Sequence, residues 1–127
     1  MSGLSDLSQL LATMRPVLHD APYGYALAAT CPSGAFACVA EDEGLTVVAL
    51  HSVLASADID PGPAWARISL TVHSDLAAVG LTAALSKALA AQGISANIVA
   101  GFHHDHIFLP WDRRHDALSA LTELSNA

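Results

Sequence analysis

Residues 66–73 alternate between apolar and polar side chains, and no other feature of the chain constrains its fold as strongly. Side chains along a β-strand point alternately to its two faces, so this alternation predicts a strand with one buried face. The apolar face carries Ala66, Ile68, Leu70 and Val72. The polar face carries Arg67, Ser69, Thr71 and His73. The strand therefore belongs to a sheet that is covered on one side.

The segments after this strand predict a definite order of elements. Ser74 or Asp75 can accept hydrogen bonds from the first free N–H groups of a helix. The leucines of this helix recur at four-residue spacing, and Gly93 ends it as a left-handed C-cap. Two strands, over residues 95–102 and 104–109, follow with a tight turn between them.

A last amphipathic helix is predicted after Pro110, with Leu118, Leu121 and Leu124 facing inward. The second half of the chain thus contains a strand, a helix, two strands and a helix. This order is a split β-α-β unit of the ferredoxin-like kind (βαββαβ) that lacks its fourth strand. The slot beside the first strand would expose a sheet edge, so another segment is expected to pair there.

The first half of the chain can supply that segment. Leucines at helical spacing predict a first helix, capped by Ser2 or Ser5 and stopped by Pro16, and the break at residues 60–63 separates the two halves. Short strands are predicted over residues 23–30, 35–40 and 45–50, and a brief helix over residues 51–57. The chain is therefore predicted to be an α+β protein with antiparallel sheets. It has two interlocked halves, residues 1–62 and 63–127, the first being a degenerate copy of the second.

Charge and hydropathy argue against several classes of partner. Five basic residues stand against twelve acidic ones, and the net charge of −7 would repel nucleic acid. Residues 1–14 lack the basic and long apolar regions of an export signal. The longest apolar stretch, residues 76–91, is interrupted by polar side chains and is too short to span a membrane. A cytoplasmic location is expected, and Cys31 and Cys38 are then expected to be free thiols packed as small hydrophobes.

Polar residues gather at the joints between the predicted elements of the second half. In a split β-α-β unit, residues 73–75 and the hairpin turn at residues 103–106 lie at the same end of the sheet. Free N–H groups at the helix start favour a carboxylate. Gly80 is expected within the first turns of the helix, where a missing side chain indicates close approach by a ligand or another chain, or close packing on the sheet.

These residues also carry a resemblance to a known family. Val79-Gly80-Leu81, the segment at residues 90–95, and the hairpin ending G-F-H-H-D-H-I-F-L-P resemble an ACT domain, most closely those of stand-alone tandem-ACT proteins of bacteria. The resemblance implies the ferredoxin-like fold and a small regulatory module that binds amino acids. In the family, the turn before the first helix and its glycine contact the ligand. Val79-Gly80 replaces the Pro-Gly pair that is common in amino-acid-binding ACT domains.

The predicted function is therefore amino-acid binding by a regulatory protein that acts through ligand-linked association. We expect a homodimer, with a further protein partner that the sequence does not identify, and neither an enzyme nor a cofactor. The expected ligand-binding residues are His73, Ser74, Asp75, Val79, Gly80, Leu81, Asn97, His103, His104 and His106.

Two other functions remain open at this stage. One is a metal-binding protein or metal-dependent enzyme that uses His73 and the cluster His103 to His106. His104 and His106 would share a strand face, and His73 on the next strand could supply a third ligand. Neither an HExxH motif nor paired cysteines support this reading. The other is a purely structural dimerisation module.

Arg67 on the polar face of its strand has two predicted roles. Its guanidinium could anchor a carboxylate of a ligand, or it could form an ion pair with Glu41 or Glu43 of the other half.

Overall fold

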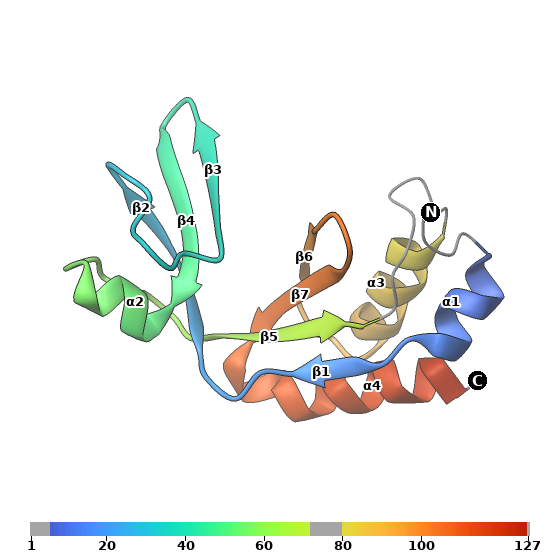
Figure 1. The fold of residues 1–127 in the computed structure, drawn as a ribbon. Helices are drawn as coiled ribbons and strands as arrows, with labels where there is room; N and C mark the ends of the chain where they lie inside the picture. The colour runs from blue at the N-terminus through green and yellow to red at the C-terminus, as the bar shows by residue number, and fades with distance from the viewer. Residues whose placement is uncertain (1–5, 72–79, 127) are drawn as a thin grey trace.

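The computed structural model describes residues 6–71 and 80–126. Within these residues, seven strands form one antiparallel sheet, accompanied by four α-helices (Figure 1). The strands are β1 (Pro16–Leu18), β2 (Tyr23–Ala28), β3 (Ala37–Glu41), β4 (Gly44–Leu50), β5 (Trp65–Leu70), β6 (Asn97–Ala100) and β7 (Asp105–Pro110). The helices are α1 (Leu7–Thr13), α2 (His51–Ser56), α3 (Leu81–Ala91) and α4 (Arg114–Asn126), with a 3₁₀ turn η1 (Trp111–Arg113) before α4.

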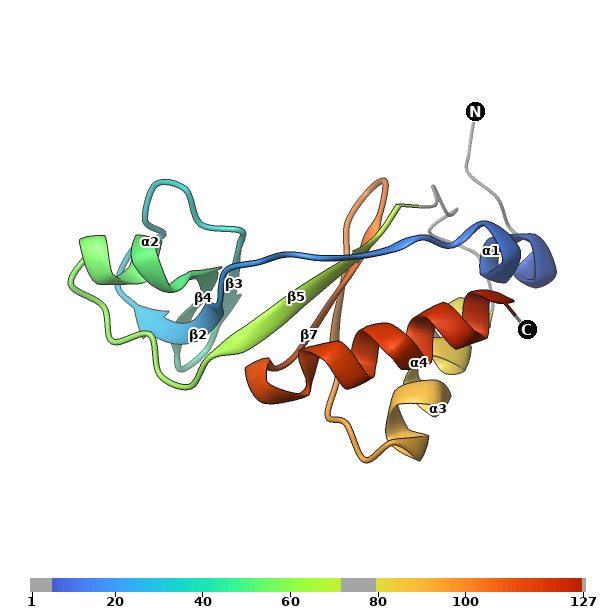
Figure 2. The same cartoon turned by 90° about the horizontal axis from the view of Figure 1, so that it is seen from below.

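The sheet joins both halves of the chain in the strand order β3-β4-β2-β5-β7-β6. It curls, so that the β2-β4-β3 arm and the β7-β6 arm rise on either side of β5 (Figure 1). Helix α2 lies against the first arm, and α3 and α4 lie beneath β5 and β7, as the view from below shows (Figure 2). The α+β fold with antiparallel, interlocked halves is thus confirmed. We call the sheet face opposite α3 and α4 the inner face.

Strand β1 fills the open slot that the sequence predicted beside β5. Leu18 pairs with Ile68 and Pro16 with Leu70, while β2 reaches the other end of the same β5 edge through the pair Tyr23 and Trp65. The first half therefore donates a strand to the second half, as expected. The donated strand itself was not predicted, because Pro16 was interpreted only as the end of a helix. Proline is tolerated as the first residue of a strand.

The apolar face of β5 is buried as the alternation predicted. Ala66, Ile68 and Leu70 are at most 1% exposed and pack against the leucines of α3 and α4. Helix α1 adds Leu10, and its C-cap Met14, to the same core. Its N-cap is Asp6, whose carboxylate accepts a hydrogen bond from the Gln9 N–H at 3.1 Å, and neither Ser2 nor Ser5 takes that place.

Helix α3 begins later than the sequence predicted. It starts at Leu81, and Gly80 is its N-cap with a φ of 96°, so the prediction that Gly80 lies inside the helix is wrong. The predicted caps, Ser74 and Asp75, lie outside the described residues. The other end is as expected, because Gly93 has a φ of 69° and its N–H donates to the Ala90 carbonyl at 2.9 Å.

Cys31 and Cys38 form a disulfide, so the prediction of free thiols is wrong. Their Cα atoms lie 6.3 Å apart, within the range that a disulfide bridges. The turn between them and the start of β3 bring the two residues together, which the reducing-compartment argument could not anticipate. In the part of the chain that the structure describes, no helix is long and apolar enough to cross a membrane.

Candidate functional site

The structure describes only part of the site that the sequence predicted. His73, Ser74, Asp75 and Val79 fall within residues 72–79, outside the described residues. The Leu81 side chain is buried in the core beneath α3 and can therefore offer a ligand only its backbone.

Gly80 is partly buried at the start of α3. It has no side chain, and among the described residues no side-chain cap accepts the first N–H groups of this helix. A Cβ atom on Gly80 would lie 3.1 Å from Cδ2 of Leu7 in α1. The close neighbour of Gly80 is therefore α1 rather than the sheet.

The histidine run is divided between two faces. His103 and His104 lie in the hairpin turn, which the Gly101 N–H closes by donating to the His104 carbonyl at 2.8 Å. Their ring centroids are 6.2 Å apart, and Phe102 beside them is 74% exposed. His106 instead lies in β7 and reaches the inner face.

A metal site is not formed by the side chains that the structure describes. Within residues 6–71 and 80–126, no group of three or more His, Cys, Asp or Glu residues could hold a metal ion. The metal hypothesis relied on His73, which lies outside these residues.

The inner face instead holds a polar cluster. Arg67 and Ser69 point from β5 to this face, because Ala66, Ile68 and Leu70 occupy the other. His106 is the cross-strand partner of Ser69, and Phe108 is the partner of Arg67. Asn97, predicted as a ligand contact, pairs with Phe108 on the outermost strand β6 and is exposed.

A chain of hydrogen bonds links five side chains of this cluster. Nη2 of Arg67 lies 3.3 Å and Oγ of Ser69 lies 2.8 Å from Nδ1 of His106. A guanidinium can only donate, so His106 Nδ1 accepts and its ring proton lies on Nε2. The Ser69 hydroxyl then donates to the same nitrogen and accepts from Nε2 of His19 at 2.8 Å. Nη1 of Arg67 donates to the Tyr23 hydroxyl at 2.8 Å.

Both histidines of the cluster are neutral near pH 7. Burial, and then the positive charge of Arg67, followed by His104 and His19, lower the pKa of His106 to about 4. Burial and then Arg67 lower the pKa of His19 as well, against a smaller opposing effect of Asp20. Arg67 is therefore the only charged side chain among the five that these hydrogen bonds link.

Arg67 is surrounded by aromatic rings. Its guanidinium carbon lies 4.3 Å from the ring centroid of Phe36 and 5.5 Å from that of Tyr23. Its buried Nε–H has no hydrogen-bond partner among the described residues. The predicted ion pair with Glu41 or Glu43 is not formed within them, where the sole ion pair joins Arg113 to Asp116.

Sequence reasoning found Arg67 and His106 but missed their neighbours. The alternation in β5 places Ser69 beside Arg67 and could have identified it. Tyr23, Phe36 and His19 reach the cluster only through the pairing of distant strands, and no local pattern marks them.

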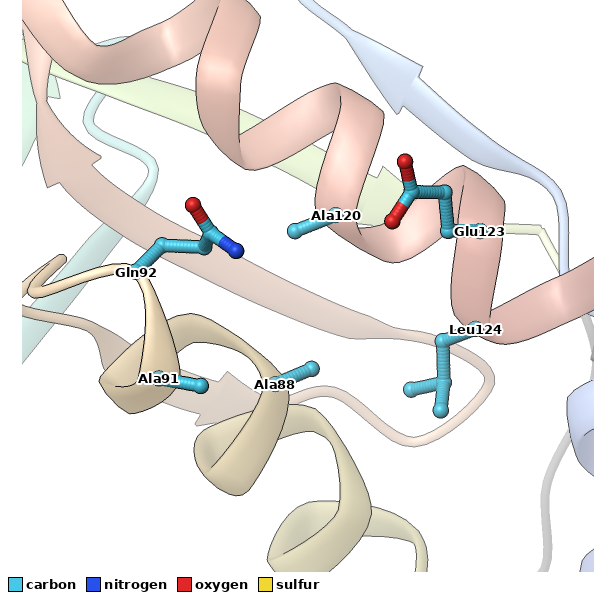
Figure 3. Close-up of a pocket in the computed structure, with 6 residues that line it drawn as sticks. All are labelled: Ala88, Ala91, Gln92, Ala120, Glu123 and Leu124. Atoms are coloured by element: carbon cyan, nitrogen blue, oxygen red, sulfur yellow. The ribbon is translucent and has the colours of Figure 1, made fainter.

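A shallow pocket of about 290 Å³ lies elsewhere, between α3 and α4 (Figure 3). It is lined by Ala88, Ala91, Gln92, Ala120, Glu123 and Leu124. Glu123 is the only charged residue of this lining, and an adjoining hollow adds Asp116. Asp116 is paired with Arg113 at 3.1 Å, so it is Glu123 that disfavours a carboxylate ligand at this pocket.

The fold and the site can now be compared with known proteins. One ACT domain family model matches residues 63–123, and a second matches residues 2–61. The chain belongs to the ACT domain family. This tandem ACT protein is 39% identical to a Vibrio cholerae protein of unknown function, described as a possible transport protein, over 98% of this chain and 99% of that one, with a TM-score of 0.82.

Two more distant structures share the fold of the ACT protein. An Agrobacterium tumefaciens protein is 18% identical, with a TM-score of 0.71 over 88% of this chain and 89% of that chain. The ligand-free regulatory subunit of aspartate kinase from Thermus thermophilus is 12% identical, with a TM-score of 0.64 over 90% and 97%. No curated protein matches the sequence significantly.

Proposed function

We propose that this protein is a regulatory module that binds an amino acid, and that binding changes its association with a second copy or with another protein. The observation that carries the proposal is the match of both halves to ACT domains. The same fold in the regulatory subunit of aspartate kinase supports a regulatory role.

The start of α3 is the proposed binding site. No described side chain caps its first N–H groups, which lie at the positive end of an eleven-residue helix, where a ligand carboxylate is favoured. The contributing residues are proposed to be His73, Ser74, Asp75, Val79, Gly80 and the turn histidines His103 and His104.

Helix α1 offers a route from this site to the rest of the molecule. Leu7 packs against Gly80, and α1 also contributes Leu10, and its C-cap Met14, to the core under α3 and α4. A ligand at the start of α3 would contact α1, so its binding energy can favour one position of that helix. By linkage, any association that depends on α1 would then depend on the ligand.

A second copy of the chain is the proposed associating partner. Strands β3 and β6 end the sheet, and no other described strand covers their outer edges. Open edges of this kind favour pairing with another chain. Pairing of one of these edges with the same edge of a second copy would produce a symmetric homodimer.

Thermal unfolding with each of the twenty amino acids tests the proposal, with zinc as a parallel arm. A ligand at about 100 times its Kd should add about 2.7 kcal/mol to the free energy of unfolding. Light scattering with and without that amino acid then measures the change in association. A shift with zinc alone would favour the metal hypothesis, and no shift with any compound would favour a structural module.

A further inference from the structure

We propose that the inner face carries a second binding site, for a small carboxylate with a planar apolar group, anchored by Arg67. This site lies on the sheet face opposite α3 and α4. It is separate from the amino-acid site proposed at the start of α3 and does not depend on it.

The guanidinium of Arg67 carries a positive charge. A guanidinium has five N–H donors, and the structure gives this one two acceptors, the Tyr23 hydroxyl and Nδ1 of His106. Both acceptors are neutral. Half-buried cations are normally paired, and among the described residues no carboxylate pairs with Arg67. The cluster therefore lacks an anion.

The Nε–H of Arg67 is buried and has no acceptor within the described chain. A buried donor without a partner is costly. Nε and an adjacent Nη present the fork that binds both oxygens of one carboxylate. A carboxylate placed there would accept a hydrogen bond from Nε and would also neutralise the guanidinium charge.

Aromatic rings determine the class of carboxylate. Phe36 covers the guanidinium and touches the rings of Tyr23 and Phe108 edge-on, with centroids 6.3 and 5.3 Å away. Phe36 directly precedes β3, and its backbone N–H donates to the Val48 carbonyl of β4 at 2.8 Å. Its ring would therefore turn aside by rotation about the side-chain bonds, which keeps this backbone pairing. A ligand with a planar apolar group would replace the Phe36 ring against Arg67 and the edges of Tyr23 and Phe108.

The neutral side chains around Arg67 fit an anion site. His106 is neutral, and its Nδ1 accepts hydrogen bonds from Arg67 and Ser69. The bond from Ser69 holds the imidazole ring in place. No Asp or Glu side chain is bonded to the cluster in the part that the structure describes. The incoming carboxylate would therefore be attracted by Arg67, against a smaller opposing effect of Asp20, which acts on His19.

Calorimetric titration of the full chain with benzoate tests this site, with benzamide as its uncharged analogue. We expect benzoate to bind and benzamide to bind at least about tenfold more weakly, because the charge-assisted contact is lost. Arg67→Gln should weaken benzoate binding to a similar extent. Lys87→Gln, which removes the same charge from the exposed face of α3, should leave it unchanged.

Two further measurements keep the test decisive. If Arg67→Gln fails to fold, Arg67→Lys retains the charge and loses the fork, so it should bind benzoate more weakly than the natural chain. In the natural chain, the Arg67 Nε–H resonance should shift as benzoate is added. Equal binding by the Arg67 variants, or an unmoved resonance at saturation, would overturn the proposal. The response to amino acids should persist in Arg67→Gln, which separates this site from the one at α3.

Discussion

Leu7 of α1 lies against Gly80 at the start of α3, with its Cδ2 atom 3.1 Å from the place that a Cβ on Gly80 would occupy. In Gly80→Ala, the new Cβ would crowd Leu7, and alanine would have to adopt the unfavourable φ of 96°. We expect a loss of about 1–2 kcal/mol in the free energy of unfolding, measured by urea denaturation.

Gly93→Ala is the matched control for that change. Gly93 also has a positive φ, of 69°, but nothing lies within 4 Å of its would-be Cβ. The excess loss in Gly80→Ala over Gly93→Ala therefore contains the contact with α1 together with the strain of the larger φ. The excess should shrink when Leu7→Ala is added, because the contact is then removed. An excess that is unchanged by this addition would show that α1 does not crowd Gly80.

Among the residues of the inner face, Phe108 is expected to contribute most to the free energy of unfolding. It is fully buried and touches the rings of Tyr23, Tyr25 and Phe36. Phe108→Ala should lower the free energy of unfolding by about 3–5 kcal/mol, through lost transfer energy and a residual cavity. Val39→Ala on an exposed edge strand should change it by less than about 0.5 kcal/mol. Similar losses in the two variants would contradict this account of the core.

Stability should fall as the pH drops from about 6.5 towards 4. The pKa of His106 is lowered to about 4, first by burial and then by Arg67, His104 and His19. The unfolded chain therefore takes up a proton at a higher pH than the folded chain does. The stabilisation is complete above the unfolded pKa and is lost as the pH falls through this window.

This effect can be separated from the titration of carboxylates by measuring thermal midpoints at steps between pH 8 and pH 4. The natural chain is compared with His106→Gln. The variant should show a shallower loss on acidification. His103→Gln, in the exposed turn, should follow the natural chain. Parallel curves for the natural chain and His106→Gln would exclude this role.

The disulfide between Cys31 and Cys38 should stabilise the loop that carries Phe36. It closes a loop with a sequence separation of 7. Chain entropy predicts that replacing both cysteines by serine lowers the free energy of unfolding by about 2–3 kcal/mol. Thiol titration of the unfolded, unreduced protein should find no free thiol, and two free thiols there would contradict the bond.

The sequence predicted the parts of the fold that depend on local periodicity. The alternation around Ile68 placed the buried face of β5 correctly, and Gly93 was recognised as a C-cap from its position after the leucine repeat. Strand β1 is three residues long and shows no period, so only its pairing with β5 reveals it. The disulfide was missed because Cys31 and Cys38, on either side of a predicted turn, were assigned as free thiols from the expected reducing compartment and not from their geometry.

The inner-face cluster was predictable only in part. The exposed side of β5 suggested Arg67 as a carboxylate anchor, but its neighbours His106 and Tyr23 come from β7 and β2. Their arrival depends on the strand registers that pair Ser69 with His106 and Tyr23 with Trp65. These registers result from long-range packing, which a single sequence does not encode in any short segment.

The pairing of β1 with β5 also bears on how the chain folds during synthesis. Strand β1 leaves the ribosome early, but the strand that it pairs with follows only after β2, β3, β4 and α2 have been made. The apolar residues of α1 and β1 must wait exposed until then, which makes this contact slow to form. Strand β1 is thus the first strand of the first half to be synthesised and the last to find its place in the sheet. A nascent chain arrested before residue 65 would leave β1 unpaired and available to chaperones or to another copy.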